Sequence, residues 1–236
     1  MATLASKTRG PIQITRAGTQ VTLSLADVAI LRAEFEAAHC IRLPGLLAPD
    51  LLAALLVRIA RARFEDRVHE GIGPNRELWM TDQALTGVLQ LLTNARPLFD
   101  LVETVTGCDR IGSFLGRVYR VVPGHGHHDA WHDDMVGGRL VAMSVNLGLE
   151  PFEGGVLQIR ERPTRRMLNE IANIGPGDAI AFRLSRGLEH RIAEVQGRVA
   201  KTVFAGWFIA APVFATALGQ VIRMRGSGAA PPHAVG

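Results

Sequence analysis

The sequence predicts an α+β fold in which a mostly helical first part precedes a β-jelly roll. Helical patterns with recognisable ends occupy much of the first 107 residues. Between residues 110 and 210, about seven or eight short apolar segments alternate with turn residues, which is typical of sandwiches and jelly rolls. The 236 residues suit one domain, because neither an internal repeat nor a linker marks a second one.

The helical part is expected over residues 24–107. Ser24 is a suitable N-cap for a helix that reaches about Ala38. Pro49 precedes a second helix at Asp50–Phe64, where leucines recur at helical spacing. Three further segments are expected here: a strand at Cys40–Gly45, a loop at His69–Pro74 and a helical stretch at 81–106, broken near Pro97 and ended by Gly107. A loose arm with a short strand at Gln20–Leu23 is expected before them.

The jelly-roll core is expected over residues 110–210. Its strands are expected at Arg110–Val122, Leu140–Leu149, Val156–Arg160, Ala179–Leu184, His190–Val195 and Lys201–Ala210. Residues 163–173 are interpreted as a polar connection. The tail at 226–236 is rich in small residues and is expected to be mobile.

Composition narrows the function classes. The net charge of +4 and the pI near 9.8 come from 26 basic residues, of which only Lys7 and Lys201 are lysines. The arginines are scattered, so we expect no nucleic-acid partner. No apolar run is long enough for a membrane span, no apolar signal core stands near Met1, and two cysteines give no disulfide framework. A cytoplasmic location is therefore expected.

One stretch concentrates the chemistry of the chain. Residues 125–134 read HGHHDAWHDD and hold four of the eight histidines. Within it, His132 and Asp134 form an H-x-D pair, whose side chains share one side if the segment is extended. His190 is the distal candidate for a third ligand, because distant strands of a jelly roll meet in one barrel. Two histidines and one carboxylate are the ligand set of non-haem Fe(II) oxygenases. An isolated H-x-D is more often a surface cluster, so the flanking sequence has to decide.

The flanking sequence resembles the Fe(II)/2-oxoglutarate-dependent dioxygenases, in the branch that includes prolyl 4-hydroxylases. The resemblance covers roughly residues 110–210 and rests on the order of short motifs: Pro123-Gly124, His132-Asp133-Asp134, Val145-Asn146-Leu147, Glu153-Gly154-Gly155, Gly175-Pro176-Gly177-Asp178 running to Phe182, then His190, Lys201 and Trp207. Each motif alone is weak, whereas all of them in order are specific. The resemblance implies a double-stranded β-helix, the cupin-like form of the jelly roll, with a helical annex before it.

The resemblance also implies roles for single residues. His132, Asp134 and His190 would hold the metal and be catalytic. The family places a Lys or Arg about ten residues after the distal histidine, to bind the C5 carboxylate of 2-oxoglutarate. Lys201 stands eleven residues after His190 and is favoured, with Arg198 as its rival. Tyr119 is a further candidate contact for the co-substrate.

The chain departs from the family pattern in several places. The segment after His190 lacks the common proline-valine pair, and one residue is added before Lys201. His125, His127 and His128 are extra, and could form a lid at the active-site mouth or an ordinary solvated loop. Trp131 and Met135 could line the substrate pocket or simply pack against the rim of the barrel.

The function implied is that of a 2-oxoglutarate-dependent dioxygenase acting as a hydroxylase, with Fe(II), 2-oxoglutarate and O2, and with ascorbate as an optional reductant. The co-substrate would be converted to succinate and CO2. The presence of Asp134 favours hydroxylation over halogenation, while desaturation or ring formation stays open. We expect a small-molecule substrate, such as an amino acid or a natural-product intermediate, with a peptidyl substrate second. The alternatives are a cupin-like metalloenzyme that does not use 2-oxoglutarate, a binding protein on a degenerate barrel, and a nucleic-acid repair oxygenase.

Overall fold

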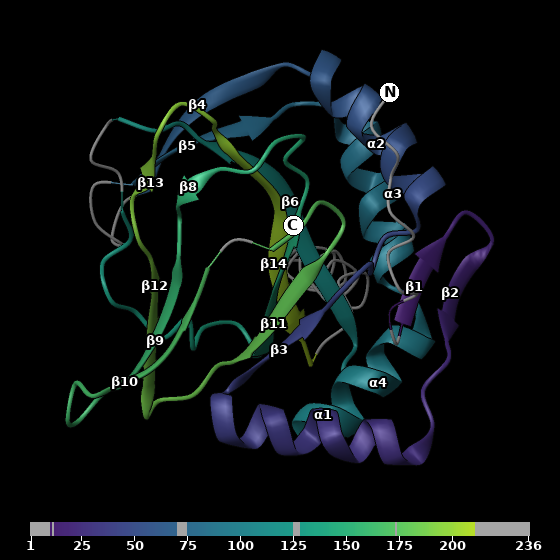
Figure 1. Ribbon diagram of the computed structural model, residues 1–236, viewed down its shortest axis with the longest axis vertical. Helices are drawn as coiled ribbons and strands as arrows, with labels where there is room; N and C mark the ends of the chain where they lie inside the picture. Colours follow the sequence, from purple (N-terminus) through teal and green to yellow (C-terminus); the bar gives the residue numbers. More distant parts are fainter. Residues whose placement is uncertain (1–9, 11, 70–74, 125–127, 173, 211–236) are drawn as a thin grey trace, which may run out of the picture.

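The computed structural model describes residues 10, 12–69, 75–124, 128–172 and 174–210 (Figure 1). Its elements are, in chain order, β1 (Ile12–Thr15), β2 (Gly18–Val21), α1 (Leu25–Ala38), β3 (Cys40–Leu43), α2 (Pro49–Arg61), β4 (Phe64–His69), β5 (Asn75–Met80), α3 (Gln83–Thr93), α4 (Arg96–Thr106), β6 (Ser113–Val121), β7 (Arg139–Asn146), β8 (Glu153–Gly154), β9 (Leu157–Glu161), β10 (Met167–Ile171), β11 (Ala179–Arg183), β12 (Leu188–Ile192), β13 (Val195–Gln196) and β14 (Lys201–Ile209).

Two antiparallel sheets form the barrel. The larger has the strand order β3-β11-β7-β14-β6-β5-β4, and the smaller has the order β10-β9-β12. The short pair β13-β8 lies beside them. Figure 1 shows the smaller sheet facing the larger one, while the helices lie on the outer side of the larger sheet. This is the double-stranded β-helix of the predicted α+β class, and the hollow between its two sheets is where the candidate site lies.

Two apolar clusters hold these layers together. One joins the helices to the outer face of the larger sheet and includes Leu85, Val102, Phe114 and Phe208, each at most 1% exposed. The other fills part of the space between the sheets and includes Ile159 and four further strand residues, which are Ala142, Leu157, Ile180 and Phe182. Because both faces of β7, β11 and β14 are covered, these strands read as nearly continuous apolar runs.

Several predicted elements are present with small shifts. The first helix has the predicted Ser24 cap, with a complete capping box to Asp27. The helical stretch at 81–106 is two helices, because the chain turns at Asn94-Ala95 and Pro97 stands near the start of α4. Gly107 ends α4 at φ 65°, a backbone conformation that suits glycine. Among the described residues, no helix is long and apolar enough to span a membrane.

Other expectations need correction. The second helix ends at Arg61 rather than Phe64, because Phe64 begins β4. The strands β4 and β5 were not predicted, and neither was β10, which stands within the expected polar connection at 163–173. The arm before the first helix contains the hairpin β1-β2, anchored by the fully buried Ile12 and Ile14. The expected mobile tail at 226–236 lies outside the described residues.

Candidate metal centre and co-substrate pocket

Three side chains predicted to bind metal come together between the sheets. The ligand atoms of His132, Asp134 and His190 all lie within 4.8 Å of one another. The Nε2 atoms of His190 and His132 lie 3.4 Å and 3.9 Å from Oδ2 of Asp134. This separation is short enough for one ion to contact all three groups.

Backbone pairing positions the two imidazoles. His190 lies in the middle of β12, and the segment that contains His132 runs antiparallel beside it. The His132 N–H donates to the His190 carbonyl (3.1 Å), and the His190 N–H donates to the His132 carbonyl (2.8 Å). Nδ1 of His132 lies 2.8 Å from the Ala130 carbonyl. A proton on Nδ1 satisfies that contact and leaves the Nε2 lone pair for a metal.

Asp134 reaches the histidines in a different way from the one predicted. The segment is not extended there, because Asp134 has a φ of 57°, in the left-handed region. This kink, and not strand alternation, turns the carboxylate toward the imidazoles. The carboxylate is held by Nη1 of Arg139 (2.8 Å to Oδ1) and Nε1 of Trp207 (2.7 Å to Oδ2).

The protonation states of this cluster suit metal binding. Burial alone would raise the pKa of Asp134, but hydrogen bonds from His190 and Trp207, together with the nearby histidines, lower it to about 2. Burial lowers the pKa of His190 below its ordinary value, and Asp134 offsets only part of this effect. The carboxylate is therefore ionised and the buried imidazole is neutral at pH 7, which are the forms that bind metal ions.

A cavity of about 250 Å³ contains this cluster. Its walls come from both sheets, including the strand β5 of the larger one; besides the three candidate ligands they include Glu77, Arg117, Tyr119, Asp129, Arg139, Ser144, Phe182, Ile192 and Trp207. Sequence reasoning missed Glu77, Arg117, Asp129 and Arg139. Only Asp129 carried a signal, because it lies inside the His-rich stretch.

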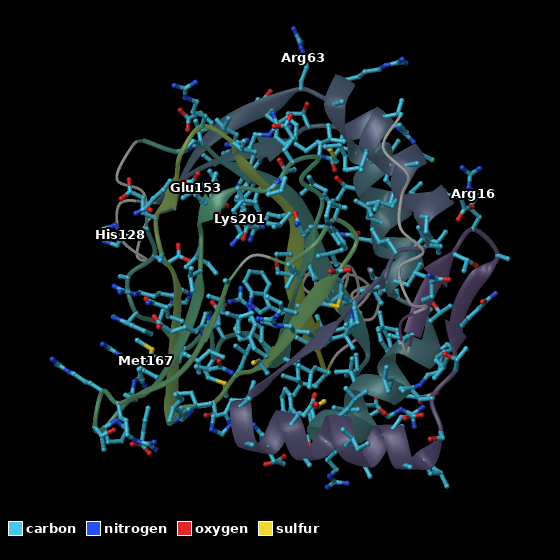
Figure 2. All side chains as sticks on the ribbon, viewed as in Figure 1. Arg16, Arg63, His128, Glu153, Met167 and Lys201 are labelled. Carbon is cyan, nitrogen blue, oxygen red and sulfur yellow. The ribbon has the colours of Figure 1, made fainter. Side chains whose placement is uncertain are left out.

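Lys201 lies next to this cavity. Figure 2 shows its side chain in the space enclosed by the two sheets. Ser144, Phe182 and Ile192 line both the main cavity and a smaller hollow that includes Lys201. The ammonium group donates to the Gly155 carbonyl (2.8 Å). Burial lowers the pKa of Lys201 to about 8, although the charges of Asp129 and Glu77 act in the opposite direction.

The remaining predicted residues take different places. Tyr119 is partly buried in the cavity wall, and its removal from solvent raises the pKa of its phenol well above the ordinary value, so it stays a neutral hydroxyl. Arg198 is exposed and lines a separate surface hollow with residues of α2, so the structure does not bring it to the metal cluster. Arg198 lies between β13 and β14, outside both strands.

Trp131 and Met135, which flank the ligands in the sequence, do not line the main cavity. Trp131 is covered by the guanidinium groups of Arg160 (4.0 Å) and Arg191 (4.6 Å), outside the residues that line the main cavity. Met135 is exposed and lines another hollow. His128 is exposed at the outer edge of the molecule in Figure 2, beside a small hollow that it shares with Lys201. The predicted lid residues His125 and His127 lie outside the described residues.

Comparison with known proteins agrees with this geometry. Residues 116–209 match the family model described as the 2OG-Fe(II) oxygenase superfamily. No curated protein is a significant sequence relative of the chain. Among solved structures, an oxidoreductase of the 2OG-Fe(II) oxygenase family from Burkholderia pseudomallei has a TM-score of 0.60 at 15% identity, covering 84% of this chain and 95% of its own. A prolyl-4-hydroxylase from Pseudomonas putida has a TM-score of 0.56 at 16% identity, covering 77% and 98%.

A third solved structure belongs to a protein with a different reaction outcome. The non-haem, alpha-ketoglutarate-dependent epimerase SnoN from nogalamycin biosynthesis has a TM-score of 0.60 at 15% identity, covering 89% of this chain and 94% of its own. At these identities the neighbours establish the shared fold only. The family match runs from β6 to β14 and spans the candidate ligands, and the donor set suits iron. Residues 116–209 therefore match the 2OG-Fe(II) oxygenase superfamily, and the metal-ligand set within them is consistent with Fe(II).

Proposed function

We propose that this oxygenase hydroxylates an unactivated C–H bond of a small molecule, with Fe(II) held by His132, Asp134 and His190. One observation carries the proposal: the three donors face a cavity of about 250 Å³ between the two sheets. That volume lies just below the usual range for ligand pockets, roughly 300–1,000 Å³, and the co-substrate must share it. The space favours a small substrate over a large one.

The second part of the proposal concerns the co-substrate. Lys201 is the cation for the C5 carboxylate of 2-oxoglutarate, because its buried ammonium group lies beside the metal cavity and already donates to a carbonyl there. The neutral hydroxyl of Tyr119 offers a further donor in the same wall. Arg198 is the weaker candidate, because it is exposed on another surface.

The bound iron and co-substrate supply the oxidation, in which O2 is consumed, 2-oxoglutarate becomes succinate and CO2, and one oxygen atom enters the substrate. The protein orients the reacting C–H bond and excludes water. Phe182 and Ile192 give the cavity apolar walls beside the candidate ligands. Arg139 and Trp207 fix the orientation of the Asp134 carboxylate.

The test is an anaerobic titration of purified protein with Fe(II) and 2-oxoglutarate, monitored by the weak visible charge-transfer band of the iron–co-substrate chelate. We expect a band in the wild-type protein. Lys201→Ala should lose most of the co-substrate affinity, whereas Arg198→Ala, a matched removal of positive charge, should keep it. A well-folded, metal-loaded protein without the band would contradict the 2-oxoglutarate site and favour a cupin-like metalloenzyme that does not use this co-substrate.

A peptidyl substrate is the second candidate, because one neighbour in fold is a prolyl-4-hydroxylase. Reactions under 18O-labelled O2 separate the two candidates, because the labelled oxygen atom identifies which compound is hydroxylated. Screening free amino acids and small natural products against proline-containing peptides should give a product heavier by one labelled oxygen in the first group. Labelled product only from peptides would replace the small-molecule proposal.

A further inference from the structure

A second arginine in the cavity has a different environment from Arg139. Arg117 lies on β6 and lines the cavity that contains the candidate metal ligands. Its guanidinium lies 4.1 Å from the ring centre of Trp79 and 5.7 Å from that of Trp207. The two aromatic rings hold the guanidinium in place. Because Arg117 is only partly buried, its guanidinium still borders the cavity.

Among the described residues, none accepts a hydrogen bond from the side chain of Arg117. No carboxylate of those residues forms an ion pair with its guanidinium either. An arginine offers five N–H donors and no acceptor. By contrast, Arg139 donates to Asp134 and Lys201 donates to Gly155.

The carboxylates that line the cavity accept hydrogen bonds from other groups rather than from Arg117. Asp134 accepts from Arg139 and Trp207, Glu77 accepts from Nε1 of Trp79 (2.8 Å), and Asp129 accepts from the Ile192 N–H (3.2 Å). The faces of the Arg117 guanidinium contact the two tryptophan rings, and its N–H groups are left for an acceptor that enters the cavity. The planar fork of a guanidinium matches the two oxygens of a carboxylate.

We propose that Arg117 binds a carboxylate group of the substrate, which makes the substrate a small organic acid whose apolar part extends toward the metal cluster. This inference rests on the proposed function and names its substrate class. The rings of Trp79 and Trp207 hold the plane of the guanidinium, so its N–H groups are oriented before the acid arrives. Arg117 is then a specificity residue, distinct from the co-substrate cation Lys201.

The test uses matched acids and amides. 3-Phenylpropionate and 4-methylpentanoate are compared with 3-phenylpropanamide and 4-methylpentanamide, which have the same shape without the charge. Binding is measured by saturation-transfer NMR on protein loaded with Zn(II), a diamagnetic replacement for Fe(II), and saturated with 2-oxoglutarate. We expect both acids to bind and both amides to bind at least about tenfold more weakly, because a hydrogen-bonded charge pair is worth about that much.

Three variants make the result specific. Arg117→Gln should bind the acids at least about tenfold more weakly, and Arg117→Lys should give an intermediate loss, since it keeps the charge without the fork. Arg120→Gln is the matched control on the same strand, because Arg120 lies over Phe64 and lines a different hollow. It should bind the acids as the wild type does. The unchanged anaerobic chelate band shows that each variant is folded and loaded.

Four results would contradict the assignment of Arg117 to the substrate carboxylate. Acids that fail to bind, amides that bind as well as acids, or acids that bind equally to Arg117→Gln would each do so. An Arg117→Gln variant that loses affinity only for 2-oxoglutarate would assign Arg117 to the co-substrate instead. The proposed function fails separately, if the chelate band is absent from the wild type while the acids still prefer Arg117.

Discussion

Asp134 combines two features at the scale of a single residue. Its backbone is in the left-handed region, which a non-glycine residue adopts at a cost on the order of 1 kcal/mol or more. Its carboxylate receives hydrogen bonds from Arg139 and Trp207, and these contacts stabilise the conformation. The strain serves the site, because the kink aims the carboxylate at both histidines. An extended conformation at Asp134 would avoid this backbone cost, but it would turn the carboxylate away from the two histidines.

The first prediction separates Asp134 from its neighbour. Asp134→Ala should abolish iron-dependent formation of succinate and lower the iron content of the purified protein, because only two ligands remain. Asp133→Ala is the matched control, since Asp133 pairs with Arg162 (3.0 Å) and lies outside the ligand cluster. It should keep most of the activity. Full iron content and activity in Asp134→Ala would rule out the proposed ligand set.

A second prediction at this scale concerns Lys201 and pH. The free protein holds this lysine at a pKa of about 8, lowered by burial, with Asp129, Glu77, Tyr119 and His128 lining the same hollow. Below pH 8 the ammonium group is charged and can bind a carboxylate. Above pH 8 binding must first take up a proton, so the affinity for 2-oxoglutarate should fall by up to about tenfold per pH unit.

The control for this pH dependence is Lys201→Arg, because a guanidinium stays charged at every pH used. Titrations of the anaerobic chelate band on both sides of pH 8 measure the affinity. The wild type should weaken as the pH rises, while Lys201→Arg should show a flatter profile, whatever its absolute affinity. Equal slopes in both proteins would mean that another group titrates, and that Lys201 does not bind the co-substrate.

At the scale of the elements, the apolar strands could be predicted, whereas the polar strands β4, β5 and β10 could not. The cores of β7, β11 and β14 are apolar on both faces, and their pattern indicates buried strands. The edge strands β4 and β10, and β5 beside β4, carry charged and polar residues, as strands at a sheet edge do to avoid pairing with other chains. Their sequences FEDRVH, NRELWM and MLNEI therefore resemble loops or helix ends. Glu77 and Trp79 were missed with β5.

The residues of the candidate site also divide into those that the sequence indicated and those that it did not. The three candidate ligands and Lys201 could be proposed because the H-x-D pair stands among ordered motifs that resemble a known family. Arg117 and Arg139 could not, because two arginines among 24 carry no signal until the strands place them beside Trp207. Cation–π contacts and ion pairs between distant strands depend on register, which sequence patterns do not specify.

The pairing of β6 with β14 yields a prediction at this scale. Gly206 stands opposite Gly116, and a Cβ at Gly206 would lie 2.0 Å from the Leu115 carbonyl oxygen and 2.5 Å from the Gly116 Cα. The backbone of β6 would have to move, so Gly206→Ala should lower the free energy of unfolding by about 1–3 kcal/mol or more. Urea denaturation measures this change.

A glycine in open space is the control for Gly206. Gly87 lies within α3, and a Cβ there would meet nothing within 4 Å. Gly87→Ala should leave the free energy of unfolding unchanged or raise it by up to about 1 kcal/mol, because alanine is the better helix former. An equal effect of the two substitutions would mean that the close approach of β6 and β14 does not limit the residue at Gly206.

At the scale of the whole molecule, the proposed metal ion would connect the smaller sheet to the larger sheet. His190 lies on the smaller sheet, while Trp207 and Arg139, which hold Asp134, lie on the larger sheet. The helices stabilise the outer face of the larger sheet and leave the inner side to the site. Binding of the metal should therefore stabilise both sheets together, as one cooperative unit.

The last prediction measures this coupling. A ligand that binds only the folded state at 100 times its Kd adds about 2.7 kcal/mol to stability. For a chain of this size, each kcal/mol raises Tm by about 2–4 °C, so Zn(II) with 2-oxoglutarate should raise Tm by roughly 5–10 °C. Asp134→Ala should lose the rise, and Asp133→Ala should keep it. An equal rise in Asp134→Ala would mean that Asp134 is not a ligand of the bound metal.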